Sequence, residues 1–262
     1  MRKILKRLIK YSMKQNRKYF NLHLGQECYI FGNGDSIKYF DLALFSDKIS
    51  FGCNALRLHK DFQKLNLKYY ISVHPLEFAP IWRGYKTGFY LEKNPYYKLH
   101  QGFQNTGYIH FVHPSNYLFI KNKTNFRFIH NLNRYPISLE YCDFTTSSSF
   151  VNGSLQTMVG LAIYMGFKKA YLVGCDYFFK PLVNGHFWNP NPGKFDVTSY
   201  DPKELMDVVE KAIDLTVITR EGVSAKINSI QYKKLFGVNE TYKNAEKIVS
   251  KNDINTLVKN HS

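Results

Sequence analysis

Residues 28–36 read Cys-Tyr-Ile-Phe-Gly-Asn-Gly-Asp-Ser, and this stretch predicts the fold of the chain. Its first four residues are apolar and favour a β-strand, and the run ends abruptly in the turn Gly32-Asn33-Gly34. A short apolar run bounded by turn residues is typical of a buried parallel strand. Residues 37–44 then read as a helix. The stretch therefore predicts the first strand, turn and helix of an α/β domain.

Strand and helix alternate along much of the remaining sequence. We expect further strands at residues 49–53, 69–73, 109–112, 126–129, 170–173 and 225–228, and further helices at residues 56–65, 155–165 and 203–216. Such alternation is typical of a parallel sheet with helices on its faces. The predicted fold class is α/β, with a single doubly wound, mostly parallel Rossmann-like sheet, a GT-A-like variant, and a small lid.

The composition indicates one principal domain. A chain of 262 residues with 44% hydrophobic content can bury one sizeable core, which excludes a disordered protein. We expect a basic arm at residues 1–20, a nucleotide-sugar-binding catalytic domain at residues 21–238 and a polar tail at residues 239–262. The lid is expected from segments near residues 85–135 and 176–200, and residues 180–200 read as a long mobile loop.

Positive charge is concentrated at the N-terminus. The chain carries a formal charge of +16, and residues 1–20 hold eight Lys and Arg and no acid. As a helix, this segment places Ile4, Leu5, Leu8 and Ile9 on one side and basic residues around the other, a pattern typical of helices on anionic membrane surfaces. A solvated arm that packs on its own domain remains the alternative. The segment is too charged to span a bilayer and lacks the features of a secretory signal.

The sequence contains no motif for a metal or a redox cofactor. Cys28, Cys53, Cys142 and Cys175 are widely spaced, without a CxxC pair or a histidine at zinc-ligand spacing, and read as small buried residues. Asp176 has no second acid two residues away, so there is no D-x-D motif for a metal-bound diphosphate. We expect no cofactor and no metal site.

Polar residues follow the expected strands at the places where ligands bind open parallel sheets. These residues are Gly32-Asn33-Gly34, Asn54, His74 and Gly174-Cys175-Asp176, and they are expected to converge. The glycines would let a phosphate or ribose approach the backbone, and Asp35 or Ser36 would cap the following helix. An ordinary strand-to-helix turn is the alternative. The turn matches neither the G-x-G-x-x-G fingerprint nor a P-loop.

Two stretches carry a resemblance to a known family. Residues 28–54 contain a strand, the sequence GNGDS and a second strand that ends in Cys53-Asn54. Residues 152–179 contain an apolar helix followed by Gly-Phe-Lys-Lys-Ala-Tyr-Leu-Val-Gly-Cys-Asp-Tyr-Phe. Together they resemble the bacterial sialyltransferases of glycosyltransferase family 42, whose core is shared with pterin-pyrophosphokinase-like and motility-associated transferases.

The resemblance implies a function and its partners. It implies an inverting, metal-independent glycosyltransferase that moves a sialic acid or related nonulosonic acid from a CMP-activated donor to a bacterial surface glycan, in lipopolysaccharide or capsule biosynthesis. The expected partners are the CMP-sugar donor, the glycan acceptor and an anionic membrane surface. We expect a cytoplasmic protein, peripheral on the inner face of the bacterial membrane, and leave a homo-oligomer open.

The resemblance also implies site residues. Those expected to bind the donor are Gly32, Asn33, Gly34, Ser36, Asn54, Asn152, Gly153, Ser154, Gly174 and Asp176. His186 corresponds to the family's catalytic base, and an imidazole is suited to deprotonating an acceptor hydroxyl. The family's phosphate-facing tyrosine falls on Phe178, so Tyr177, one place earlier, is the second catalytic candidate. His186 could instead be incidental or contact only the acceptor.

Two other functions remain open from the sequence. The first is a pyrophosphokinase-like or other nucleotide-using enzyme of the same fold. The second is a basic nucleic-acid-binding protein, because residues 117–134 interleave aromatic and basic residues. We do not expect nucleic acid as a partner, since aromatics also stack on sugars and no RNA-binding signature is present.

Overall fold

The fold is built on one large parallel sheet. The computed structural model describes residues 2–83, 91–93, 107–131, 135–180, 182–191, 193–196, 203–220, 223–224 and 227–255. The eight strands of the sheet are β1 (Glu27–Phe31), β2 (Ile49–Cys53), β3 (Leu67–Ser72), β6 (Ile109–Val112), β7 (Phe126–Phe128), β10 (Lys169–Val173), β14 (Asp214–Thr219) and β16 (Asn228–Gln231). Their order is β16-β14-β10-β1-β2-β3-β6-β7, and every neighbouring pair is parallel. The predicted α/β fold is confirmed.

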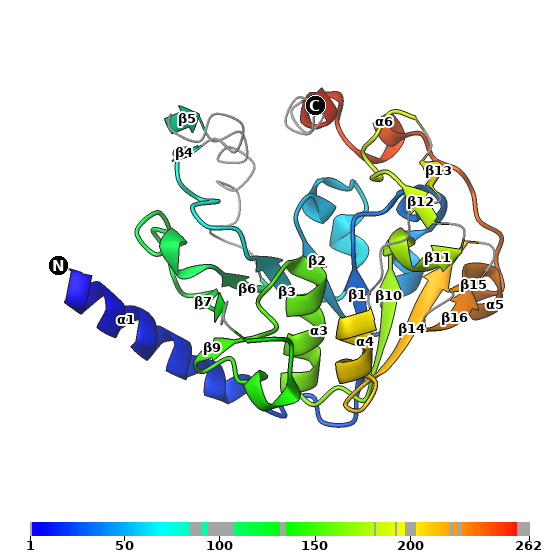
Figure 1. Cartoon of the computed structure of the whole chain (residues 1–262). Coiled ribbons are helices and arrows are strands. Elements are labelled where there is room, and N and C mark those ends of the chain that lie inside the picture. The colour runs from blue at the N-terminus through cyan, green and yellow to red at the C-terminus, as the bar shows by residue number, and fades with distance from the viewer. Residues whose placement is uncertain are drawn as a thin grey trace.

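Helices and short turns cover the sheet (Figure 1). The helices are α1 (Arg2–Lys14), α3 (Ser154–Tyr164), α4 (Lys203–Val209), α5 (Tyr232–Phe236) and α6 (Ala245–Ile248). In the view of Figure 1, α3 and α4 lie in front of the sheet. None of the helices in the described part of the chain is long and apolar enough to cross a bilayer.

Small two-stranded pairs lie outside the main sheet. They are β4 (Ile81–Arg83) with β5 (Leu91–Lys93), β8 (His130–Asn131) with β9 (Ser147–Ser148), β11 (Phe179–Lys180) with β15 (Val223–Ser224), and β12 (Leu182–Asn184) with β13 (Lys194–Asp196). The β12–β13 hairpin lies in the stretch expected to be a mobile loop. In the first expected lid segment, β6 and β7 are strands of the main sheet, whereas residues 84–90, 94–106 and 132–134 lie outside the described residues.

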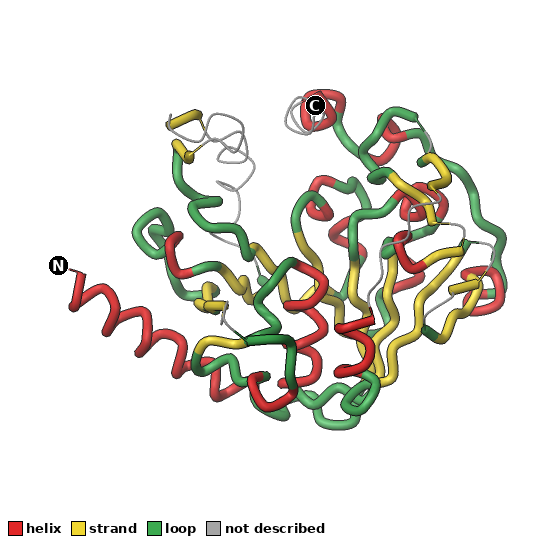
Figure 2. Tube along the Cα trace, in the orientation of Figure 1, coloured by secondary structure: helices red, strands yellow, loops and turns green. Residues whose placement is uncertain are grey.

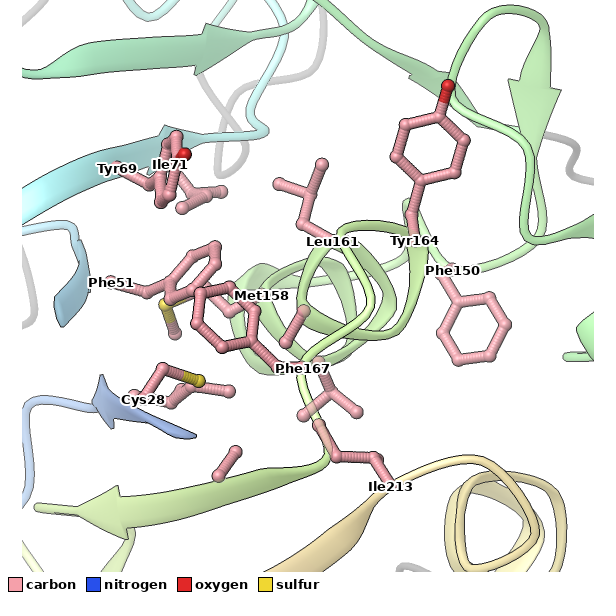
Figure 3. Packing of buried hydrophobic residues seen from close by; sticks show 14 of the residues in the cluster. Cys28, Phe51, Tyr69, Ile71, Phe150, Met158, Leu161, Tyr164, Phe167 and Ile213 are labelled. Atoms are coloured by element: carbon pink, nitrogen blue, oxygen red, sulfur yellow. The ribbon is translucent and has the colours of Figure 1, made fainter. Parts of the chain in front are cut away.

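Two hydrophobic clusters pack on the two faces of the sheet. Along β1, Cys28 and Ile30 point into the cluster beneath α3, and Tyr29 and Phe31 point into the cluster on the opposite face. Successive strand residues face opposite sides, so a strand buried on both sides reads as one continuous apolar run. Figure 3 shows the first cluster, with Met158 of α3 among its core side chains. This arrangement is the doubly wound architecture expected from the sequence.

The close packing of α3 depends on one glycine. A Cβ on Gly160 would lie 2.5 Å from the Cβ of Phe150, well inside normal contact distance. The helix therefore packs directly on the wholly buried Phe150 ring. Cys28, Cys53 and Cys175 are buried, as predicted, whereas Cys142 is only half-buried; all four cysteines are free.

Two predicted helices are instead pairs of 3-10 turns. Residues 37–44 fall in the turns Asp35–Tyr39 and Leu42–Phe45, and residues 56–65 in the turns Leu56–Leu58 and Phe62–Lys64. In the first case Ile37, Phe40, Leu42 and Phe45 are all buried, at spacings that a single 3.6-residue period cannot place on one face. The Asp41 carboxylate also accepts a hydrogen bond from Ala43 N and starts the second turn.

The predicted helix at residues 203–216 is wrong in its second half. Helix α4 ends at Val209, and β14 begins at Asp214. The β-branched run from Thr216 to Thr219 favours a strand, and its pairing with β10 and β16 outweighs the helical pattern before it. The final strand lies at Asn228–Gln231 rather than at residues 225–228.

Both terminal segments contribute to the core. Met13, Asn16 and Tyr19, at the end of the basic arm, are buried, and Asn16 Nδ2 donates to the carbonyls of Phe128 (2.9 Å) and Phe144 (2.8 Å). In the C-terminal segment, α6 buries Ala245 and Ile248. Parts of the N-terminal arm and of the C-terminal tail are therefore packed into the domain.

Candidate functional site

The candidate site lies where the direction of strand addition reverses. From β1 the chain adds β2, β3, β6 and β7 on one side, and it then returns to place β10 on the other side of β1. In open α/β sheets, ligands bind at the carboxyl ends of the strands near such a switch point. This edge is at the top of the sheet in Figure 1, and it carries the Gly32-Asn33-Gly34 turn, Asn54 and Gly174-Cys175-Asp176.

The turn after β1 is packed tightly against the end of β10. Gly32 N donates to Val173 O and Gly34 N to Gly174 O, both at 2.8 Å. A Cβ on Gly32 would lie 2.3 Å from Gly174 O, and a Cβ on Gly34 would lie 2.5 Å from the Asp176 carboxyl carbon. These glycines are therefore required by strand packing, a reason different from the expected approach of a phosphate.

Asp176 is bonded to Ser36. The Asp176 carboxylate is almost wholly buried and accepts hydrogen bonds from Ser36 N (2.7 Å) and Ser36 Oγ (2.5 Å). Burial raises the pKa of Asp176 to about 7, although the Ser36 hydrogen bonds act in the opposite direction. Both residues were expected to bind the donor, and the structure shows that they bind each other.

Asn33 faces the other side of β1, toward β2. The residue is only 8% exposed, and Asn33 Nδ2 donates to Cys53 O at 3.3 Å. Within the described residues, Asn33 Oδ1 is buried and has no hydrogen-bond partner. An unpaired buried amide oxygen costs on the order of 1–3 kcal/mol, so a ligand atom that donates to it would recover that free energy.

Asn54 and the start of α3 lie on the β2 side of β1, as Asn33 does. Asn54 has the left-handed φ of +52°, and its carbonyl accepts from Tyr70 OH at 2.6 Å. Ser154 Oγ lies 3.3 Å from Asn54 Oδ1. Hence the sequence-distant residues Asn33, Asn54 and Ser154 form one contiguous group.

The N-terminus of α3 is open. Gly153, with φ +93°, precedes the helix and provides no side-chain cap, and Asn152 and Gly153 are exposed. The uncapped amides of a helix start carry partial positive charge and favour anions. Gln156, in the first turn, has a buried Oε1 without a partner in the part of the chain described here. Sequence reasoning missed Gln156 because one glutamine in an apolar helix carries no distinctive pattern.

The structure brings His186 to the same turn. His186 forms an isolated antiparallel bridge with Gly34, and Phe187 N donates to Asn33 O at 3.1 Å. The Nδ1 atom of His186 lies 3.3 Å from Asn33 O, and its ring stacks on Trp188 with centroids 4.2 Å apart. Because a carbonyl only accepts, this bond requires the proton on Nδ1 and leaves the lone pair on Nε2.

A buried ion pair fixes the loop that carries His186. The ammonium of Lys38 is wholly buried, 2.6 Å from Asp35 Oδ1, and it also donates to Asn191 O at 2.8 Å. The turn after β1 and the 186–191 loop are therefore held as one unit. The i, i+3 spacing of Asp35 and Lys38 was the available sequence signal, but it does not reveal burial.

Tyr177, the second catalytic candidate, packs against hydrophobic residues. It packs against the cluster beneath α3, hydrogen-bonds Cys175 and contacts the ring of Phe178.

Among the residues described, no group of three or more His, Cys, Asp and Glu side chains could hold a metal ion.

Arg220 is a further cation at this edge that sequence reasoning missed. It directly follows β14, and its guanidinium lies 4.3 Å from the centroid of the Tyr39 ring. Its charge acts to lower the pKa of Asp176, against the larger effect of burial. A lone Arg after a strand has no spacing pattern that would have identified it.

Comparison with known proteins gives only distant matches. No protein-family model matches the chain, and neither does any curated protein. The sialyltransferase CstII from Campylobacter jejuni, in complex with CMP-3FNeuAc, is 17% identical with a TM-score of 0.47, and the match covers 90% of this chain and 99% of CstII. The same enzyme with cytidine-5'-monophosphate is 19% identical, with the same coverage and a TM-score of 0.43. The monofunctional alpha-2,3-sialyltransferase Cst-I from Campylobacter jejuni is 16% identical with a TM-score of 0.40, over 90% of this chain and 95% of Cst-I.

The buried Asp176 carboxyl predicts a pH-dependent stability. Its pKa is about 7 in the folded chain and 3.8 in the unfolded chain, so folding takes up a proton between these values. The free energy of unfolding should therefore fall as pH rises through this window. Between about pH 5 and about pH 8, urea denaturation should show the free energy of unfolding of wild type falling by about 2.5 kcal/mol more than that of Asp176→Asn. Equal losses in the two proteins would contradict a raised pKa at Asp176.

Proposed function

We propose that this chain is a glycosyltransferase that moves a sialic acid or related nonulosonic acid from a CMP donor to a bacterial surface glycan. One observation carries the proposal: at the switch point of the sheet, the buried and unpaired Asn33 Oδ1 lies beside Asn54 and the uncapped start of α3. This group combines neutral hydrogen-bonding side chains with an anion-binding helix terminus, as a nucleoside monophosphate requires.

The amide side chains suit the cytosine base. Cytosine presents an amino group that donates hydrogen bonds, together with ring nitrogen and carbonyl acceptors. An asparagine side chain both donates and accepts, so Asn33 Oδ1 could accept from the amino group. Such a bond would satisfy the one buried oxygen of Asn33 that has no partner among the described residues.

The start of α3 suits the phosphate. The exposed Gly153 allows a ligand to approach the first amides of the helix, and Ser154 adds a hydroxyl beside Asn54. These groups would stabilise the negative charge that CMP carries as it departs. Inverting transfer without a metal ion is part of the proposal.

His186 is the proposed general base. Its Nε2 accepts the proton of the acceptor hydroxyl while the hydroxyl oxygen forms the new bond to the anomeric carbon of the donor. The bond between that carbon and the phosphate oxygen breaks, and its electron pair leaves with CMP. The hydrogen bond from Nδ1 to Asn33 O couples the base to the nucleotide-binding turn. For Tyr177, the expected contact with the departing phosphate stays a prediction.

Calorimetric titration of the full chain against CMP, UDP and ATP tests the donor. CMP should bind most tightly, and Asn54→Ala should weaken it by about tenfold or more, because hydrogen bonds to the ligand and to Ser154 are lost. Asn239→Ala, at an exposed position, is the matched control and should leave CMP affinity unchanged. Tighter binding of ATP would overturn the CMP donor and favour a pyrophosphokinase-like enzyme.

Variants of two histidines test the base. With a CMP-sialic acid donor and a glycan acceptor, followed by mass spectrometry, His186→Ala should lower turnover by about 10²–10⁴-fold and leave CMP affinity nearly unchanged. His74→Ala, at the exposed end of β3, should retain turnover. If His186→Ala retained transfer and His74→Ala lost it, His186 would not be the base.

A further inference from the structure

The N-terminal segment presents an apolar surface to solvent. We use the term N-terminal surface for the exposed residues between Arg7 and Leu24, on α1 and on the segment that follows it. Its large apolar residues have these exposed fractions: Leu8 44%, Tyr11 67%, Phe20 47%, Leu22 51% and Leu24 74%. Figure 2 shows α1 extending beyond the strands and ending in a loop that leads to β1. Burying such side chains would be favourable wherever a complementary partner exists.

The apolar residues of α1 are divided between the core and solvent. Ile9 and Met13, four residues apart, pack into the hydrophobic cluster of the protein. Leu8 and Tyr11, three residues apart, share another face of the helix and remain exposed. The sequence-based expectation placed Leu8 and Ile9 on one membrane-facing side. The structure corrects this expectation: the side of α1 with Ile9 packs on the domain, and the side with Leu8 is exposed to solvent.

Positive charge surrounds the exposed apolar residues. Arg7, Lys10, Lys14, Arg17 and Lys18 are all exposed in the same segment. Residues 1–26 contain no Asp or Glu, so no acid within the segment neutralises these charges. Basic side chains can lie along apolar surface with their charged ends directed outward. The N-terminal surface therefore matches a partner that is apolar inside and anionic outside.

We infer that the N-terminal surface docks the protein on an anionic lipid bilayer. Phospholipid headgroups would pair with the basic residues, and the acyl region would receive Leu8, Leu22, Leu24 and the two aromatic rings. A nucleic acid would satisfy the charges, but it would gain little from exposed leucines, because it binds by stacking bases on aromatic rings. The expected location on the inner face of the bacterial membrane stays a prediction.

Docking would orient the candidate site. Asn21 N donates to Tyr164 O (3.1 Å) and Gly25 N to Gly166 O (2.9 Å), so the segment that carries Leu22 and Leu24 lies at the C-terminal end of α3. Asn54 and Ser154 lie at its N-terminal end, about 16 Å away along the helix. The site would then open away from the bilayer, which, if the proposed function holds, suits a glycan acceptor that projects from the membrane.

Vesicle co-sedimentation of the full chain tests the inference without any assay of activity. The protein should pellet with phosphatidylcholine vesicles that contain phosphatidylglycerol, and much less with phosphatidylcholine alone. High salt should weaken binding only in part, because the apolar contacts persist. Lys10→Glu/Lys14→Glu and Leu22→Ser/Leu24→Ser should each weaken binding by about tenfold or more. Changes at exposed positions leave the fold intact, as circular dichroism would verify.

Matched variants elsewhere separate a specific surface from general positive charge. Lys233→Glu/Lys234→Glu on α5 alters another exposed lysine pair and Val223→Ser on β15 another exposed apolar residue, and both should bind vesicles as wild type does. The inference is overturned if the α5 pair weakens binding as much as the α1 pair. It is also overturned if Leu22→Ser/Leu24→Ser binds as wild type, or if an oligonucleotide binds more tightly than the vesicles and displaces them.

Discussion

The close contact between the ends of β1 and β10 is the constraint on which the rest of the site depends. Gly32 and Gly34 leave room for Gly174 and the Asp176 carboxylate, and Asp176 then holds Ser36 by two hydrogen bonds. Because a buried carboxyl needs hydrogen bonds to offset its desolvation, this contact fixes the conformation of the turn. The neighbouring pair of Lys38 and Asp35 extends the same rigid unit to the loop that carries His186.

Because of this contact, the residues at the switch point form two groups: those that build the turn and those that could bind a ligand. Toward β10, Gly32, Gly34, Ser36, Gly174 and Asp176 are occupied with one another and build the turn. Toward β2, Asn33 has a buried amide oxygen without a partner among the described residues, and Asn152 and Gly153 at the uncapped start of α3 are exposed. Asn54 and Ser154 are half-buried beside them and bond each other. A ligand would therefore bind on the β2 side of β1. His186 spans the two groups, because it pairs with Gly34 and lies beside the carbonyl of Asn33.

Much of this arrangement could be predicted from the sequence. Buried parallel strands read as apolar runs that end in turn residues, and the polar residues after them converge because parallel strands end at one edge. The sequence did not reveal which polar residues bind each other, since the pairing of Ser36 with Asp176 depends on strand order. The split of α1 between core and solvent also depends on tertiary packing. The 3-10 turns after β1 were missed for a similar reason: burial of Phe40 and Phe45 outweighed local helical preference.

The most direct test of the central claim is hydrogen–deuterium exchange of the full chain with and without CMP. If the nucleotide binds on the β2 side of β1, CMP should protect peptides that cover residues 32–36 and 152–156, with a smaller effect around residue 186. Protein bound to CMP without protection in either of the first two peptides, or with protection confined to residues 117–131, would contradict the account.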